Sequence, residues 1–98
     1  MTLRLRVTAR AAAEIERVDE WWWKNRFSAA GAVREDLKSA FQLLLQPGIG
    51  QRAGNARLAG TRRLHMDRIR YYLYYRTTSE EVVVLSLWHS NRGRGPRV

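Results

Sequence analysis

The sequence contains no cysteine among its 98 residues. This absence excludes a disulfide framework, a thiolate metal site and a thiol nucleophile together. Histidine is nearly as scarce, since only His65 and His89 are present, and a zinc site built from two histidines alone would be unusual. A glycine-rich phosphate loop is missing too, because the glycines at positions 93 and 95 lack the required strand-to-helix setting. The sequence therefore predicts neither a metal nor a cofactor.

The N-terminus lacks a continuous apolar run. Leucine and arginine alternate over residues 3–6, so neither a signal peptide nor a membrane span is expected, and a cytoplasmic location is the simplest expectation. The hydrophobic fraction of 45% lies in the ordinary globular range. Because no linker-like stretch divides the chain, residues 1–98 are expected to form one domain.

Acidic residues are half as common as basic ones. Nine Asp and Glu stand against eighteen Lys and Arg, which gives a net charge of +9, and sixteen of the eighteen bases are arginine. Residues 1–47 carry a net charge of +2 and residues 48–98 a net charge of +7. Arginine pairs with two oxygens of a carboxylate or phosphate at once. The basic side chains of the C-terminal half are therefore expected to gather on one surface that faces an acidic macromolecule; a GC-rich genome would explain the arginines but not the asymmetry.

The apolar periodicity of the N-terminal half predicts a strand followed by a helical hairpin. A short strand is expected around residues 3–7, and Thr8 is placed to cap the first helix. Ser28 is expected to cap a second helix that stops at Pro47, and the short link makes the two helices antiparallel neighbours. The expected apolar stripes are Ala11, Ile15, Val18 and Trp22 in the first helix, and Val33, Leu37, Ala40, Phe41 and Leu44 in the second.

The C-terminal half reads as a loop, three strands and a tail. Residues 48–60 contain four glycines and no clear period, which predicts a loop. Strands are expected at residues 61–66, 69–76 and 81–88, in an antiparallel meander packed on the helices. Residues 89–98 are expected to form a basic tail. The element order predicts an α+β fold.

Alternation along residues 69–76 places side chains on two faces of the expected sheet. The more apolar set, expected against the helices, is Ile69, Tyr71, Leu73 and Tyr75. The other set, expected to form an outward-facing ladder, is Arg70, Tyr72, Tyr74 and Arg76. Such a ladder can stack bases, contact phosphates or bind an acidic peptide, and an ordinary solvated face is the alternative.

Three consecutive tryptophans follow in one expected helix. Neighbouring helical positions point about 100° apart, so the three rings cannot all enter one core. Trp22 fits the apolar stripe, Trp21 flanks it, and Trp23 falls on the polar side. An exposed indole there favours a docking surface for another protein chain over a nucleic acid, because the acidic neighbours Asp19 and Glu20 would repel phosphates.

A histidine beside arginines closes the last strand. His89 precedes Arg92 and Arg94, and such a group can perform acid–base work on a phosphodiester while arginine stabilises the developing charge. A single histidine at a strand end is more often structural. His65 has still less support, since only Arg62 and Arg63 lie near it in the sequence.

Taken together, these segments resemble the RelE/ParE toxins of bacterial toxin–antitoxin modules. The resemblance covers nearly the whole length and keeps the family's element order. It rests on the helix of residues 8–23, the helix ending at Pro47, the strand Tyr71-Tyr72-Leu73-Tyr74-Tyr75-Arg76, the valine-rich strand of residues 82–87, and Trp88-His89-Ser90-Asn91-Arg92-Gly93.

The resemblance implies two activities on one fold. RelE-like members cleave mRNA inside the ribosome, whereas ParE-like members poison DNA gyrase and are not nucleases. Nuclease members typically place an arginine at the position of Tyr72 here, although a shifted register would bring in Arg70, which would share the face of Tyr72. This departure, with no lysine in residues 48–98, favours a non-catalytic gyrase inhibitor. The alternatives are a ribosome-dependent mRNA endoribonuclease that uses Arg70 and His89, and a non-toxic nucleic-acid-binding domain.

The resemblance also implies a cognate antitoxin whose acidic, partly disordered tail folds over the toxin. The helical hairpin around Trp21 and Trp23 is expected to form part of the antitoxin groove. The residues expected to bind the target are Arg70, Tyr72, Tyr74, Arg76, His89, Arg92 and Arg94.

Overall fold

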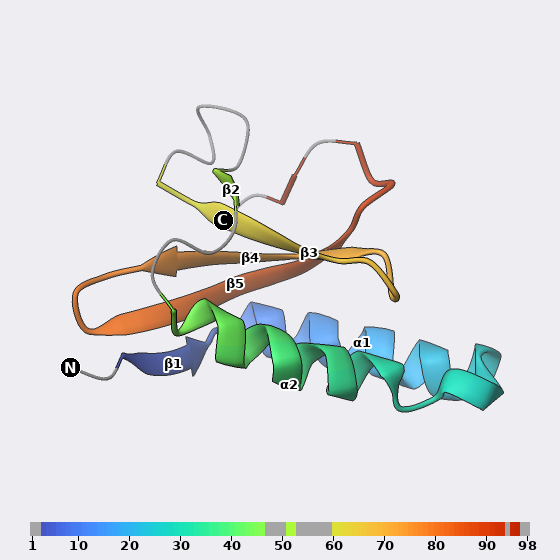
Figure 1. Cartoon of the computed structure of the whole chain (residues 1–98). Helices are drawn as coiled ribbons and strands as arrows, with labels where there is room; N and C mark the ends of the chain where they lie inside the picture. The colour runs from blue at the N-terminus through green and yellow to red at the C-terminus, as the bar shows by residue number, and fades with distance from the viewer. Residues whose placement is uncertain (1–2, 47–50, 53–59, 94, 97–98) are drawn as a thin grey trace.

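The computed structural model of the chain describes residues 3–46, 51–52, 60–93 and 95–96. The elements follow one another as strand, α-helix, short 3-10 helix, α-helix and four strands (Figure 1). This order confirms the predicted α+β fold. No helix within these residues is long and apolar enough to span a membrane.

The first strand leads directly into a capped helix. Strand β1 covers Arg4–Val7 and helix α1 covers Ala9–Asn25. Between them, Thr8 has an extended backbone, and its hydroxyl accepts a hydrogen bond from the backbone N–H of Ala11 at 3.1 Å. This bond satisfies one of the amide groups that the first helical turn leaves unpaired, so the predicted cap is confirmed.

The second helix begins later than predicted. A 3-10 turn, η1, covers Phe27–Ala29, and helix α2 covers Ala32–Leu44. Ser28 lies inside η1, so its predicted role as the α2 cap was wrong; the residue before α2 is Gly31, which has no side chain to cap with. The helices run antiparallel, as predicted (Figure 1). The predicted stop at residues 47–48 lies outside the described residues.

The strands of the C-terminal half form one mixed sheet with β1. Strand β2 covers Gln51–Arg52, β3 Arg62–Met66, β4 Tyr71–Thr77 and β5 Glu81–His89, in the order β1-β5-β4-β3-β2. Strands β2 to β5 pair antiparallel in succession, which confirms the predicted meander, and β1 pairs parallel with β5.

Two boundaries differ from the prediction in ways that matter for function. Strand β4 starts at Tyr71 rather than at position 69, because residues 67–70 make the turn from β3. Strand β5 extends to His89, which therefore belongs to the sheet and not to a tail. The two residues of β2 lie within the predicted loop of residues 48–60.

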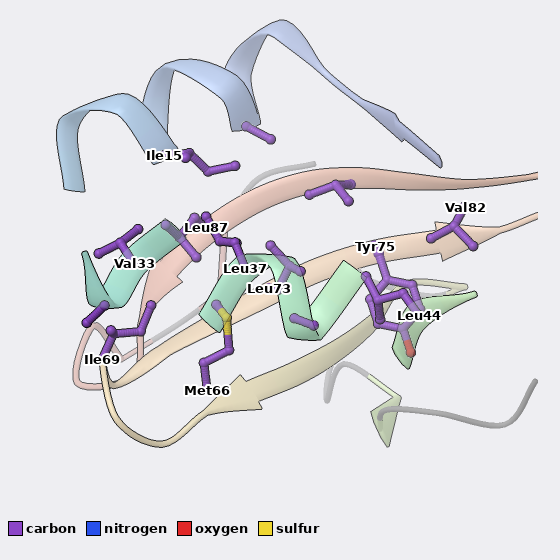
Figure 2. Close-up of a cluster of buried hydrophobic side chains, with 14 residues drawn as sticks. Ile15, Val33, Leu37, Leu44, Met66, Ile69, Leu73, Tyr75, Val82 and Leu87 are labelled. Carbon is purple, nitrogen blue, oxygen red and sulfur yellow. The ribbon is translucent and has the colours of Figure 1, made fainter. Parts of the chain in front are cut away.

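Both helices cover the same face of the sheet and enclose the core there (Figure 1, Figure 2). The larger buried side chains of this core are Ile15, Val33, Leu37, Leu44, Met66, Ile69, Leu73, Tyr75, Val82, Val84 and Leu87. Burying one such side chain contributes about 1.5–3 kcal/mol, so this set fixes which face of each strand points inward. The predicted stripes of both helices and the predicted inward set of β4 are confirmed.

A carboxylate fastens the middle of α1 to the end of β5. Strand β1 pairs with β5 only as far as Val84, which leaves the next residues of β5 without a strand on that side. Glu14 of α1 fills this gap: its Oε1 accepts hydrogen bonds from the Ser86 hydroxyl at 2.8 Å and from the Leu87 backbone N–H at 3.2 Å. These bonds hold α1 beside the last residues of β5.

Candidate binding cleft

A cleft of about 600 Å³ lies where the end of α1, the β3–β4 turn and the end of β5 meet. In Figure 1 this turn bends from the sheet towards the helices. We call the cleft the arginine cleft and define it by six of its lining residues: Trp21, Arg26, Arg68, Arg70, Tyr71 and His89. None of the described residues that line it carries a carboxylate. A smaller hollow of about 270 Å³ adjoins it, shares Trp21, Tyr71 and His89, and adds Arg17, Arg92 and the carboxylate of Glu14.

Arg70 is held in an unusual backbone conformation at the wall of the arginine cleft. Its φ is 63°, a left-handed value that costs an L-residue about 1–2 kcal/mol. The carbonyl of Arg70 accepts two hydrogen bonds from Ser90, one from the backbone N–H at 2.9 Å and one from the hydroxyl at 2.8 Å. The N–H of Arg70 donates to the carbonyl of Met66 at 2.9 Å. These three bonds hold the strained conformation in place.

The two arginines of the β3–β4 turn differ in their partners. The guanidinium of Arg68 binds Asp36 at 2.6 Å and Glu35 at 3.0 Å, and these hydrogen bonds raise the pKa of Arg68. The exposed guanidinium of Arg70 makes no ion pair with any residue that the structure describes. Arg70 therefore presents an uncompensated positive charge to the cleft, whereas Arg68 fastens the turn to α2.

His89 reaches the cleft from the last position of β5. Its Nδ1 lies 3.1 Å from the backbone N–H of Asn91 and accepts a hydrogen bond from it. In a neutral imidazole this leaves the ring proton on Nε2, so His89 offers a donor and not a base at that nitrogen. The ring of Tyr71, its register partner on β4, lies edge-on at 4.9 Å.

The Tyr71 hydroxyl stays neutral in this setting. Burial raises the pKa of Tyr71, and the nearby positive charge of Arg92 opposes that rise in part. The guanidinium carbon of Arg92 lies 4.2 Å from the centre of the Trp88 ring, and the indole N–H of Trp88 donates to the Arg92 carbonyl at 2.9 Å. The turn after β5 is thereby folded back onto the sheet end.

Helix α1 contributes an indole and a second arginine. Trp21 is 49% exposed and stands edge-on to Trp22, with ring centres 6.4 Å apart. The guanidinium carbon of Arg26 lies 5.9 Å from the Trp21 ring. Trp23 is 58% exposed but is not among the residues that line the cleft. Of the two tryptophans predicted to bind the antitoxin, Trp21 therefore lines the arginine cleft and Trp23 lies outside it.

The acidic side chains of α1 are neutralised by bases on the helical hairpin. Glu16 and Asp19 both bind Arg34 of α2, at 2.6 and 3.0 Å. Glu20 binds Lys24 at 2.9 Å. The predicted repulsion of phosphates by these carboxylates therefore does not extend to the arginine cleft.

The opposite face of the sheet is packed rather than open. Tyr74 lies beside Tyr72 as predicted but is only 2% exposed, so the expectation that this ladder is open to a partner was wrong. Its register partner on β3, Arg63, covers the ring of Tyr72 at 4.1 Å and reaches the Tyr74 hydroxyl at 3.5 Å. The His65 ring packs on Tyr72 at 4.8 Å. Pro96 is also fully buried.

The residues predicted to bind the target divide between these two faces. Arg70 and His89 line the arginine cleft, and Arg92 lines the adjoining hollow. Arg70 was predicted to share a face with Tyr72, but it lies in the turn before β4 and lines the arginine cleft, which Tyr72 does not. Arg76 lies exposed near the far end of β4, where its Nε donates to the Thr61 hydroxyl at 3.2 Å.

The described basic residues of the C-terminal half thus do not gather on one surface, and that prediction was wrong. Arg94 lies outside the described residues. Sequence analysis missed Arg26, although it follows the tryptophans at the end of the first helix, and it placed Tyr71 on the core side without expecting it to line a cleft. It also missed Ser90, for which no sequence signal exists. Within the described residues, no group of three His, Asp or Glu side chains is placed to hold a metal ion.

Comparison with known proteins identifies the class. The family model for the ParE toxin of the type II toxin–antitoxin system parDE matches residues 5–93. The chain therefore belongs to the ParE toxin family, which confirms the predicted resemblance. Among solved structures, the fold is similar to that of the chromosomal ParDE TA system from P. aeruginosa, at 21% identity and a TM-score of 0.72, covering 89% of this chain and 95% of the other. A search of curated proteins gives no match.

Proposed function

We propose that this toxin inhibits bacterial growth by poisoning DNA gyrase, and that the arginine cleft is the surface with which it holds the gyrase–DNA complex. The observation that carries this proposal is the arrangement of Arg70 and His89. Both line the cleft, Arg70 as a cation that forms no ion pair with a described residue and His89 as a hydrogen-bond donor. This arrangement suits a surface that grips an anionic partner.

The same arrangement favours binding over catalysis. A general base needs a nitrogen that is free of protons and faces the substrate. In His89, Nδ1 is already occupied by the N–H of Asn91, so a neutral ring would hold its proton on Nε2. His65 is paired with Asp67 at 2.6 Å and packs on Tyr72, on the opposite face of the sheet.

Neutralisation by the cognate antitoxin follows from the position of Trp21. This indole, predicted to bind the antitoxin, lines the same cleft as Arg70 and His89. An antitoxin segment that packs on Trp21 would cover the groups that hold the target. Its acidic side chains would pair with Arg26 and Arg70, neither of which forms an ion pair with a described residue.

One observation supports the alternative of an mRNA endoribonuclease: Arg70 and His89, the two residues that this activity requires, do lie in one cleft. An arginine near a histidine can stabilise the charge that develops on a cleaved phosphate. The third candidate, a non-toxic nucleic-acid-binding domain, depended on an open Tyr72/Tyr74 ladder, and Tyr74 is buried.

An induction experiment separates the activities. The full chain is expressed without antitoxin as wild type, Arg70→Gln, His89→Ala and Arg4→Gln, the last being a matched charge change at the opposite end of β5 from His89. A gyrase poison produces double-strand breaks and a DNA-damage response while transcripts stay intact. We expect this outcome for wild type and Arg4→Gln, with toxicity lost in Arg70→Gln and retained in part by His89→Ala. Cleaved transcripts with an intact chromosome, abolished by His89→Ala, would instead establish the nuclease.

A further inference from the structure

The arginine cleft combines two kinds of group that can bind a ligand together: partly exposed aromatic rings and arginines that form no ion pair with a described residue. Trp21 offers a half-exposed indole, and Tyr71 and His89 provide two further rings beside it. Arg26 and Arg70 supply the positive charge. We propose that this cleft is a nucleotide-binding site, which takes a phosphate on Arg70 and a base against Trp21. The inference rests on the proposed function and deepens it: the part of the gyrase–DNA complex that enters the cleft is the DNA strand.

The hydrogen-bonding character of the lining fits a phosphate. A guanidinium has only donors, so Arg26 and Arg70 bind groups that accept. His89 also presents a donor, because its Nδ1 is engaged with Asn91. Tyr71 adds a neutral hydroxyl whose ionisation is disfavoured by burial. The phosphodiester of a DNA strand presents two non-bridging oxygens that only accept hydrogen bonds, and two arginines with a histidine donor match them.

The aromatic rings decide between a nucleic acid and an acidic peptide. Carboxylate side chains would pair with the arginines, but they carry no aromatic ring to stack on the indole of Trp21. A base has such a face, and stacking on an aromatic side chain is a main source of affinity for single strands. The cleft volume of about 600 Å³ lies within the range of sites for small ligands and suits one or two nucleotides.

The two arginines of the β3–β4 turn explain how the site is held in place before a ligand binds. Arg68 is bound to Asp36 and Glu35 and so anchors the turn. Arg70 is held by Ser90 in a left-handed conformation that keeps it in the cleft wall. The turn is therefore rigid before a ligand arrives, and little conformational entropy is lost when a phosphate binds.

Fluorescence anisotropy with a labelled six-nucleotide oligothymidylate tests the site without gyrase. Stacking and a charge-assisted phosphate contact each correspond to roughly tenfold in affinity, so Trp21→Ala and Arg70→Gln should each weaken binding about tenfold. Trp21→Phe, which keeps a ring, should retain most of the affinity. Arg4→Gln removes the same charge far from the cleft and should weaken binding less than about twofold.

Two further probes exclude simple charge attraction and a peptide ligand. An oligonucleotide of equal charge without bases should bind the wild type about tenfold more weakly than oligothymidylate does. Trp21→Ala should bind the two oligonucleotides with equal affinity. Equal weakening by Arg4→Gln and Arg70→Gln, or equal affinity for the baseless strand, would mean non-specific attraction and would overturn the proposal. So would tighter binding of a hexaglutamate peptide than of the oligonucleotide through Trp21 and Arg70.

Failure of this inference can be told apart from failure of the proposed function. If the oligonucleotide does not bind but Arg70→Gln still abolishes double-strand breaks in cells, the cleft holds gyrase protein and not DNA. If the oligonucleotide binds as expected but the wild type causes no breaks, the nucleotide site stands and gyrase poisoning is wrong.

Discussion

The two faces of the sheet contain the same residue types and use them differently. On the face away from the helices, Arg63 covers the Tyr72 ring at 4.1 Å and Tyr74 is buried. At the edge of the helix-covered face, Arg70 has no ion pair among the described residues and Trp21 remains half exposed. Arginine and aromatic side chains therefore do not by themselves mark a binding surface.

What distinguishes the faces is whether the groups already satisfy one another. A guanidinium that stacks closely on a ring of its own chain, as Arg63 does on Tyr72 at 4.1 Å, already uses its interaction within the fold. One that is fixed in place by its backbone, as Arg70 is by Ser90, keeps its interaction for a partner. The contrast between Arg68 and Arg70 shows this difference within one turn. Substitutions on the packed face should therefore lower stability, whereas substitutions in the cleft should weaken binding.

The largest effect is expected on the packed face. Tyr74→Ala should lower the free energy of unfolding by about 3–5 kcal/mol, because it removes a large buried ring. Tyr74→Phe should cost less than about 1.5 kcal/mol, since only the hydroxyl contact with Arg63 is lost. Urea denaturation measures both. A Tyr74→Ala variant of unchanged stability would show that this face is open and able to bind a partner.

The second effect concerns the antitoxin. Trp21→Ala should weaken antitoxin binding about 30-fold while leaving the stability of the toxin nearly unchanged, because exposed aromatic anchors dominate such interfaces. Trp23→Ala should also weaken it, by a smaller factor, because its ring lies outside the cleft. Isothermal titration calorimetry gives the affinities.

The control for the antitoxin measurement is Leu43→Ala, an exposed apolar residue of α2 that does not line the arginine cleft. Its affinity for the antitoxin should match wild type. Unchanged affinity in both tryptophan variants would remove the end of α1 from the antitoxin groove.

How much of this arrangement the sequence predicts depends on the range of the interactions involved. The helix stripes were predicted because burial follows a period of 3.6 residues, and Thr8 because capping is local. The start of α2 was missed because η1 intervenes between Ser28 and the helix. The left-handed backbone conformation of Arg70 is fixed by Ser90, twenty residues later, so no local sequence pattern predicts it.

The arginine cleft itself shows the same limit. Its α1 wall and its sheet wall are about fifty residues apart in the sequence, as Trp21 and Tyr71 illustrate. Alternation correctly placed Tyr71 and Leu73 towards the helices, but it gave Tyr72 and Tyr74 an open surface that Arg63 in fact covers. Only the register between β3 and β4 reveals this covering.

A third and smaller effect tests the backbone of Arg70. Arg70→Gly relieves the left-handed conformation, whereas Arg70→Ala keeps it, so the glycine variant should be more stable than the alanine variant by about 1 kcal/mol. Both should lose toxicity, because both lack the guanidinium. Paired urea titrations and growth assays distinguish the two contributions. A glycine variant less stable than the alanine variant would contradict the strained conformation.

The smallest effect is an acid-dependent one at the opposite end of β5. Hydrogen bonds from Arg6 lower the pKa of Glu81. A folded-state pKa below the unfolded one contributes stability above the unfolded value, and this contribution is lost as the pH falls through the folded value. Glu81→Gln should therefore lower Tm slightly at pH 7 and not at about pH 2. Arg6→Gln should behave alike, and a Tm difference that persists in acid would rule out this linkage.

The use of the arginine cleft against gyrase is tested most directly by DNA cleavage with purified gyrase and supercoiled plasmid. Wild-type toxin and Arg4→Gln should cause linear, gyrase-cleaved DNA to accumulate, Arg70→Gln should not, and added antitoxin should suppress the accumulation. No linear DNA with wild type, or as much with Arg70→Gln as with Arg4→Gln, would contradict the account.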